Sequence, residues 1–267
     1  MYEAMHIAAT GLHNQQRRLD TIANNVANIN SAAYKSSRLD FKDALYTAGI
    51  TPGRPRTPEG NQQKGHGVMV AGITKDYSTG SIQRTDRALD VAIQGEGFFA
   101  LEGEDGNTVY TRNGSFNLST EDDGAYLVNS EGLYVRDIND ARIRIPDNTT
   151  SINIGVDGLI TFVGSVVGEE GEAEIVEVAT AALGFYTFRN LTGLASIGGG
   201  NYAESAASGE RLQAENAVVR QGMMEMSNVR LADEMTRLIR TQRAFQLSSR
   251  ALTTADEMEG IANNMRR

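Results

Sequence analysis

The residue types that most often carry chemistry are sparse and poorly grouped in this sequence. Three histidines are present, and two of them, His6 and His13, lie seven residues apart in a stretch of helical periodicity, where they could share one face. No neighbouring carboxylate pair completes a metal-ligand set, so ordinary helix-surface positions are expected for both. The sequence contains no P-loop, nucleophile elbow or H-E-x-x-H segment. We therefore expect no metal and no cofactor.

Two acidic clusters and one pair of glycines are weak candidates for a calcium site and a dinucleotide-binding site. Glu121–Asp123 and Glu169–Glu172 lack the alternating ligands and terminal Glu of an EF-hand loop, which favours solvated hairpin tips. Gly95–Gly97 lacks the third glycine and the following helix of a dinucleotide-binding fingerprint. A carboxylate-based hydrolase using Asp90 and Glu96 is the enzymatic alternative, but no pattern places these two side chains in one pocket. The sequence thus favours a non-enzymatic protein without a small-molecule substrate.

Composition narrows the class of protein further. The 267 residues include no cysteine, which excludes disulfides and thiolate chemistry. No apolar run is long enough to cross a membrane, and the amino terminus lacks the pattern of a cleaved secretory signal. Residues 1–42 and 210–267 carry small positive excesses of +2 and +1, whereas residues 43–209 carry −12. Nucleic acid is therefore not an expected partner, and the nearly neutral ends can approach one another.

The chain begins with apolar residues spaced seven apart, as in a helix that packs along a seam. The first row and a second row three residues further on are Met5, Leu12, Leu19 and Val26, and Ala8, Gln15, Ile22 and Ile29. Two adjacent heptad positions are thus mostly apolar. The pattern predicts a helix from about Glu3 to Asn30.

The chain ends with a similar pattern. The carboxy-terminal row and the smaller residues beside it are Leu231, Leu238, Phe245 and Leu252, and Thr241, Ser248, Ala255 and Ala262. Glycine and proline are absent from Met223 to Glu259, so a helix over that stretch would be about 55 Å long at ~1.5 Å per residue. Large residues beside small ones favour close helix packing. The alternative to a coiled-coil-like pair is that both terminal segments form ordinary helices packed on one hydrophobic core.

Polar residues dilute both apolar rows and thereby indicate partners from other chains. Gln15, Asn24, Asn25 and Asn28 interrupt the first helix, so its apolar surface is too small to make it secure alone in water. Further copies of the chain would supply the missing burial as a homo-polymer. The candidate assembly residues are Met5, Leu12, Leu19, Ile22, Val26, Ile29, Leu231, Met235, Leu238, Phe245 and Leu252.

Between the two ends the pattern changes twice. A polar stretch from about Tyr46 to Gly67 has no periodicity and contains the candidate arm residues Tyr46, Pro52, Gly53, Pro55 and Pro58. A segment of this length without a pattern predicts a binding arm or a linker. From Val68 to about Ser208, short apolar runs are separated by dipeptides that favour hairpin turns: Asp105-Gly106, Asn113-Gly114, Asp123-Gly124 and Asp157-Gly158.

These patterns predict an α+β fold. The terminal helices would pair as an α-helical, coiled-coil-like domain formed by residues 1–36 plus 226–267. Residues 37–80 would form an extended arm or linker region, and residues 81–225 a mainly antiparallel β-rich outer domain with a return strand.

Several blocks of the sequence resemble the flagellar rod and hook proteins. The blocks are LDTIANNVANINSAAYKSSRLDF at 19–41, TGSIQRTDRALDVAIQGEGFF at 79–99, YTRNGSF at 110–116, FRNLTGLASIGGGNYAESAASG at 188–209 and SNVRLADEMTRLIRTQRAF at 227–245. The segment 45–68 is similar to the one that distinguishes the distal rod members of the family. Three positions depart from the usual pattern, with Ala33 in place of Gly, Leu191 in place of Pro and Ser248 in place of Asn.

The resemblance implies an axial structural protein of the flagellar basal body, located in the periplasm or cell-wall region. Such proteins leave the cell through the flagellar type III export apparatus without a cleaved signal. They polymerise with their terminal helices inside and the β domain outside. Partners would be other rod proteins, the hook protein and possible bushing rings around the rod. Alternatives are a proximal rod or hook-type member and, outside the family, a coiled-coil adapter or adhesin.

Overall fold

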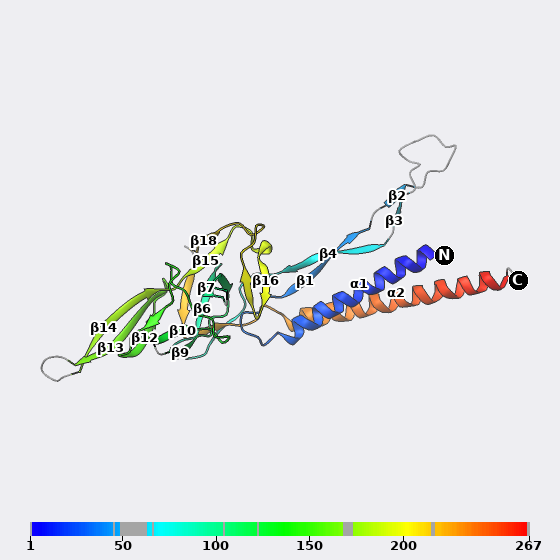
Figure 1. The fold of residues 1–267 in the computed structure, drawn as a ribbon. Helices are drawn as coiled ribbons and strands as arrows, with labels where there is room; N and C mark the ends of the chain where they lie inside the picture. The colour runs from blue at the N-terminus through cyan, green and yellow to red at the C-terminus, as the bar shows by residue number, and fades with distance from the viewer. Residues whose placement is uncertain are drawn as a thin grey trace. The chain divides into compact units, whose positions relative to one another are not determined.

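The structure, a computed structural model, describes residues 2–44, 46–48, 63–65, 67–103, 105–121, 123–167, 173–214 and 217–265. It has one long helix at each end and a mostly antiparallel β region between them (Figure 1). The predicted α+β class is therefore confirmed. The chain divides into a helical unit, Met1–Ala27, Ser37–Asp76 and Arg230–Arg267, and a β unit, Asn28–Ser36 and Tyr77–Val229.

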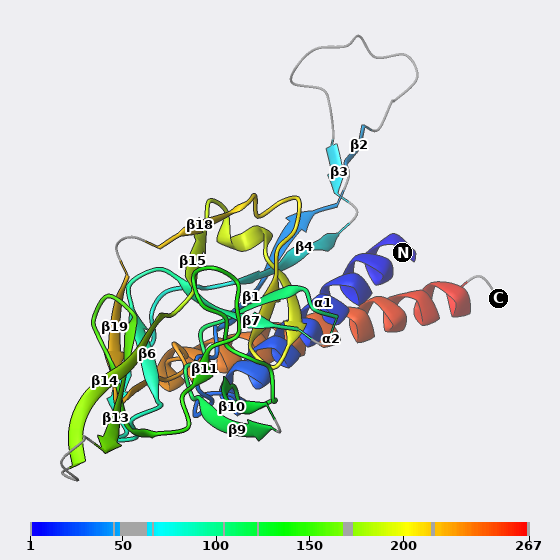
Figure 2. The same ribbon diagram turned by 60° about the vertical axis from the view of Figure 1, so that its left-hand side comes forward.

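The helical unit is built on α1 (Tyr2–Ala27) and α2 (Leu231–Met265), which contact each other and run in opposite directions (Figure 2). The predicted helix end at Asn30 is wrong by three residues, because residues 28–30 form a turn that Ser31 N–H closes by donating to Asn28 O. Neither described helix is apolar enough over a sufficient length to cross a membrane.

Helix α2 differs from the predicted stretch at both ends. It begins at Leu231 and not at Met223, because Met223–Glu225 forms a strand, β20, that pairs with β5 (Ile82–Arg84). The backbone hydrogen bonds of this pairing take the place of helical ones. At the other end α2 continues through Gly260 to Met265, since a single glycine costs only about 1 kcal/mol in a helix.

A two-stranded antiparallel sheet lies against α1 in the helical unit. It pairs β1 (Ser37–Asp43) with β4 (Val68–Lys75), with a bulge between Asp40 and Phe41. The short strands β2 (Tyr46–Ala48) and β3 (Gln63–Gly65) also form an antiparallel pair. The arm residues Pro52, Gly53, Pro55 and Pro58 lie outside the described residues, whereas Tyr46 opens β2.

The β unit contains a six-stranded antiparallel sheet in the order β16-β17-β8-β7-β15-β18. Its strands are β16 (Ala195–Gly198), β17 (Asn201–Ala203), β8 (Thr108–Thr111), β7 (Phe98–Glu102), β15 (Phe185–Phe188) and β18 (Arg211–Gln213). Smaller sheets are formed by β11-β10-β9 and β12-β13-β14, and β19 (Val218–Gln221) pairs with β6 (Val91–Gln94). Their strands are β9 (Asn117–Glu121), β10 (Gly124–Val128), β11 (Arg144–Ile145), β12 (Thr149–Ile154), β13 (Leu159–Val167) and β14 (Ala173–Ala182), and a 3-10 helix, η2, covers Leu191–Gly193.

Strand β7 separates two hydrophobic cores. Alternate residues of a strand point to opposite faces, so Phe99 and Leu101 enter one core while Phe98 and Ala100 enter the other. All four side chains are buried, which explains why this run is continuously apolar. The second core is mainly aromatic and packs its rings edge to face.

Two of the predicted hairpin turns had opposite outcomes. Asp157-Gly158 connects β12 to β13, and Gly158 adopts φ +81°, so this prediction is confirmed. The prediction for Asn113-Gly114 is wrong, because β8 and β9 on either side of it pair with other strands. Gly114 is needed there for a different reason: a Cβ would lie 1.7 Å from the carbonyl oxygen of Val91.

Candidate assembly surfaces

The inner face of α2 follows a heptad spacing. Its buried or half-buried residues at steps of four and three are Glu234, Leu238, Thr241, Phe245, Ser248, Leu252, Ala255, Glu259 and Ala262. The fully buried members are Glu234, Thr241 and Ala255. Thr241 satisfies its hydroxyl within the helix by donating to Arg237 O at 2.8 Å. This face is therefore polar at several layers, as the diluted sequence pattern indicates.

Helix α1 uses its asparagines to hold the β1–β4 sheet. Asn25 is buried and makes two hydrogen bonds with Ser37: its amide donates to Ser37 O at 2.8 Å, and Ser37 N–H donates to Asn25 Oδ1 at 2.9 Å. Asn14 is also buried and donates to Val68 O at 2.5 Å. The sequence interpretation treated asparagines as dilution of an apolar face. Here two of them join the helix to both strands.

The structure brings most of the candidate assembly residues to protected positions. Ile22 is buried, and the half-buried ones are Met5, Leu12, Leu19, Val26, Ile29, Leu238, Phe245 and Leu252. Ile29 follows the end of α1 and belongs to the β unit. Leu231 and Met235 are exposed; Leu231 continues the heptad face at the first residue of α2, whereas Met235 lies outside that face. Whether any of these residues contacts another copy stays a prediction.

Several large apolar side chains in the helical unit are exposed. On α2 they are Leu231, Met235, Ile239, Leu247, Met258, Ile261 and Met265, and on β4 they are Val68, Met69 and Ile73. Soluble monomers seldom expose many such residues close together without an interaction to cover them. These positions are candidates for surfaces between subunits, and the sequence interpretation identified only Leu231 and Met235 among them.

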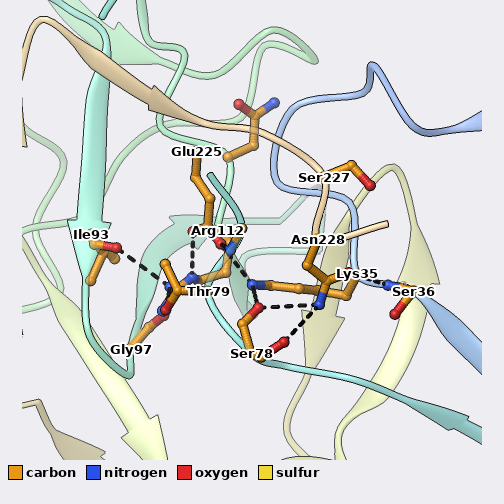
Figure 3. A network of polar contacts seen from close by, with 12 residues as sticks. Lys35, Ser36, Ser78, Thr79, Ile93, Gly97, Arg112, Glu225, Ser227 and Asn228 are labelled. Atoms are coloured by element: carbon orange, nitrogen blue, oxygen red, sulfur yellow. Dashed lines mark hydrogen bonds and ion pairs between the residues drawn. The ribbon is translucent and has the colours of Figure 1, made fainter. Parts of the chain in front are cut away.

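A buried charge network lies in the β unit (Figure 3). Glu225, at the end of β20, accepts from Lys35 Nζ at 2.7 Å and from Arg112 Nε at 2.9 Å. The side chains of all three residues are at most 3% exposed. Two positive charges thus surround one carboxylate away from water, an arrangement that needs further hydrogen bonds to be stable.

Those further hydrogen bonds come from the surrounding backbone. Gly80 N–H donates to Glu225 Oε1 at 2.8 Å, and Lys35 Nζ donates to Ser78 O at 2.7 Å. Arg112 donates to the carbonyl oxygens of Gly95 and Gly97 at 2.8 and 2.7 Å. The network therefore connects the segment after α1, the segment before β5, the bend after β6 and the end of β20.

The network also determines the ionisation of Glu225. Burial acts to raise the pKa of this carboxyl, but the charges of Arg112 and Lys35 and the hydrogen bonds from Lys35 and Gly80 outweigh it. The pKa of Glu225 is consequently held below its ordinary value of 4.5. A buried, fully paired carboxylate cannot reach a substrate, so the network is structural. Sequence reasoning missed it, although Lys35 and Arg112 lie inside the family blocks.

Residues considered for catalysis do not assemble into a site. Asp90 precedes β6 and Glu96 follows it, so the two carboxylates stand at opposite ends of one strand. Asp90 is buried and lies 3.5 Å from Arg87, whereas Glu96 is exposed. His6 and His13 are exposed on α1. In the described part of the chain, no three or more acidic or histidine side chains could hold a metal ion.

Three family models match successive parts of the chain. The model described as "Flagella basal body rod protein" matches residues 5–35, which include most of α1. "Flagellar hook protein FlgE/F/G D1 domain" matches residues 92–162 in the β unit. "Flagellar basal body rod FlgEFG protein C-terminal" matches residues 220–265, which contain α2.

Relatives match over the whole chain. The flagellar basal-body rod protein FlgG of Borreliella burgdorferi is 36% identical over 279 aligned residues, with all of both chains covered. FlgG of Bacillus subtilis is also 36% identical with full coverage of both chains. The flagellar hook-basal body complex protein FlhP of the same organism is 30% identical, again over the full length of both.

The two terminal helices and the β region between them each overlap a part of the chain that a flagellar rod or hook family model matches. The chain belongs to the flagellar basal-body rod family, and the predicted resemblance is confirmed. The protein is accordingly a structural component of the flagellar basal body and not an enzyme.

Proposed function

We propose that the protein is a subunit of the distal rod, which polymerises into a helical tube and transmits torque from the motor to the hook. The single observation that carries this proposal is the full-length similarity to proteins named flagellar basal-body rod protein FlgG. A hook-type role is the second candidate, and it rests on the 30% identity to a hook-basal body complex protein. The higher identity to the rod proteins favours the rod.

In the proposed tube, α1 and α2 pair as a coiled coil and form the inner layer. Residues 1–36 plus 226–267 would act as this inner domain and residues 81–225 as the outer one. The heptad spacing of the buried face of α2 supports the pairing, because residues at steps of four and three lie along one helical seam. Contacts between unlike surfaces of successive copies, whose rotation does not close, produce a tube and not a ring.

Export and partners follow from the same proposal. The subunit would leave through the flagellar type III apparatus without signal cleavage and would contact other rod proteins, the hook protein and any bushing rings. A chain without cysteine can travel to an oxidising compartment without mispaired disulfides. The arm from Tyr46 to Gly67 would lie across neighbouring subunits and stiffen the tube.

Electron microscopy of the concentrated, purified protein tests the proposal. We expect tubes of constant diameter, whereas monodisperse particles at every concentration would contradict a rod subunit. The arm is tested by replacing residues 49–62 with a short Gly-Ser linker and measuring the persistence length of the tubes. Tubes as stiff as those of the unchanged chain would remove the stiffening role.

A further inference from the structure

Helix α2 extends past the amino-terminal end of α1 within the helical unit (Figure 1). A Cβ built on Gly11 would lie 3.7 Å from Ser248 Oγ, so these two positions are level with each other in the antiparallel pair. Residue 2 of α1 is nine positions before Gly11 and is therefore level with Glu257, nine positions after Ser248. Residues 258–265 of α2 thus form an overhang about 12 Å long, at 1.5 Å per residue.

The overhang combines exposed apolar side chains with negative charge. Met258, Ile261 and Met265 are 51%, 59% and 78% exposed. Asp256 and Glu257 directly precede it and Glu259 lies within it, while Arg266 and Arg267 follow it in the sequence, so residues 256–267 carry a net charge of −1. The apolar side chains of the overhang are therefore largely exposed beside the three acidic residues.

A groove with an apolar lining and arginines around it lies between α1 and the β1–β4 sheet of the same unit. Its volume is about 430 Å³, and Leu39, Val70 and Ile73 supply its apolar lining. Ile73 is 63% exposed, although it is a large aliphatic residue. Volumes in this range are typical of pockets that accept a ligand of side-chain or drug size.

Arginines surround the groove and a small cavity of about 150 Å³ that shares part of its lining. The charged residues of the two together are Arg17, Arg18, Arg38, Arg237, Asp20 and Glu234. Four positive charges against two negative ones give a local excess of +2. The carboxylates of Asp256, Glu257 and Glu259 match this surface in charge, and the exposed apolar side chains beside them match it in hydrophobicity.

The occupant cannot come from the same helix pair. The groove residues of α1 lie between Arg17 and Asn24, which are level with residues 235–242 of α2 by the register of Gly11 and Ser248. The overhang begins at Met258, sixteen positions further along α2, or about 24 Å away along a straight helix. Only another molecule can bring these two surfaces together.

We propose that the overhang of α2 from a second copy of this chain, with Asp256 and Glu257 at its base, docks in the groove between α1 and the β1–β4 sheet. Met258, Ile261 and Met265 cover Leu39, Val70 and Ile73, while Asp256 and Glu257 approach Arg17 and Arg18. This head-to-tail contact joins unlike surfaces, so it propagates along the polymer. The inference rests on the proposed function and identifies one interface within it.

Cysteine pairs test this contact without background, because the natural chain has no cysteine. One tagged chain carries Ile73→Cys and a differently tagged chain carries Ile261→Cys. The two are mixed, concentrated and treated with a short bismaleimide. The matched control replaces Ile73→Cys with Leu247→Cys, since Leu247 is 66% exposed on α2 but lies outside the groove. We expect at least tenfold more two-tag product from the test pair than from the control pair.

The outcomes separate the interface from the proposed tube. Tubes with no excess of the test product would overturn the interface and leave the rod proposal standing. Two-tag product without tubes would support the interface and contradict the tube, and neither tubes nor product would overturn both. Charge reversal gives a second readout: Arg17→Glu should raise the critical assembly concentration several-fold, and added Glu257→Arg should restore it. No restoration, with cross-linking absent as well, would reject the charge pairing.

Discussion

Ala33 holds a backbone conformation that is costly for a residue with a side chain. Its φ is +54°, it is buried, and its N–H donates to Glu225 O at 2.8 Å. The left-handed region costs an L-residue roughly 1–2 kcal/mol, which fits the glycine that the resemblance to rod and hook proteins implies at this position.

Substitutions at Ala33 should separate backbone strain from packing. Ala33→Gly removes the backbone strain, but it also removes a buried methyl group and gives the unfolded chain more conformational freedom. We therefore expect the free energy of unfolding to change by no more than about 1 kcal/mol. Ala33→Val places a β-branched residue at positive φ and should lower the free energy of unfolding by more than about 2 kcal/mol. Urea unfolding followed by tyrosine signals reports on this unit, which holds seven of the nine tyrosines. Equal stability of Gly and Val variants would contradict the strain argument.

Glu225→Gln should destabilise the β unit strongly, by about 3–5 kcal/mol, because it leaves Lys35 and Arg112 buried without a counter-charge. The matched control is Asp86→Asn, which breaks the exposed ion pair with Arg84. Exposed ion pairs contribute little to folding stability, so the control variant should leave the free energy of unfolding nearly unchanged. The same urea experiment compares the two, and similar losses in both variants would show that burial of the network is not the cause.

Glu225 should make the folded β unit less stable as the pH falls. Its pKa is lower in the folded protein than the ordinary value of 4.5, so the ionised form is favoured by folding. The contribution is fully present above pH 4.5 and is lost as the pH falls through the folded pKa. The natural chain should therefore lose more stability than Glu225→Gln when both are titrated below pH 4.5. Parallel pH profiles for the two proteins would contradict this assignment.

At the scale of elements, one glycine in each terminal helix lowers the stability of that helix. Gly11 lies in α1 and Gly260 in α2, and an added Cβ meets Ser248 at an ordinary 3.7 Å in the first case and no atom within 4 Å in the second. Each Gly→Ala substitution should stabilise its helix by about 1 kcal/mol. Thermal melting followed by circular dichroism at 222 nm measures the gain.

Gly80→Ala provides the contrasting control for this prediction. A Cβ at Gly80 would stand 1.9 Å from Met226 O, beside the network of Glu225. This variant should lose stability, although it makes the same chemical change. A gain from all three substitutions would indicate a general effect of reduced chain entropy and would reject the helix-specific argument.

Elements differ in how far the sequence alone reveals them. Seven-residue periodicity predicts α1 and α2 because a helix repeats its pattern locally over many residues. Strand β20 is three residues long and pairs with β5, which is distant in sequence, so no local period marks it. The start of α2 was missed for the same reason, because Met223–Glu225 is suited to either structure until β5 is present.

The assembly residues show the same division between local pattern and tertiary context. Leu238, Phe245 and Leu252 were found because they repeat along one helix, and they lie on its protected face. The groove of Leu39, Val70 and Ile73 combines residues from strands and faces α1, so its existence depends on the pairing of β1 with β4. Likewise, Lys35, Arg112 and Glu225 are brought together from three distant places in the chain.

At the scale of the whole molecule, the two units differ in what holds them together. The β unit buries two hydrophobic cores and a fully hydrogen-bonded charge network. The heptad face of α2 instead includes the polar residues Glu234, Thr241, Ser248 and Glu259, and much of the apolar surface of α2 is exposed. The helical unit should thus be the less stable part of an isolated subunit.

Hydrogen exchange before and after assembly tests this difference. In the monomer, amides of α1 and α2 should exchange quickly, because a helix pair with little apolar burial opens at low free energy, while amides of β6, β7 and β8 should be protected. In tubes, neighbouring copies cover the exposed apolar residues and both helices should become protected. Under the proposed function, ordering of the helices would depend on the presence of other copies, so export and assembly would require no separate switch. Strong protection of both helices in the monomer would contradict this coupling, whatever the tubes show.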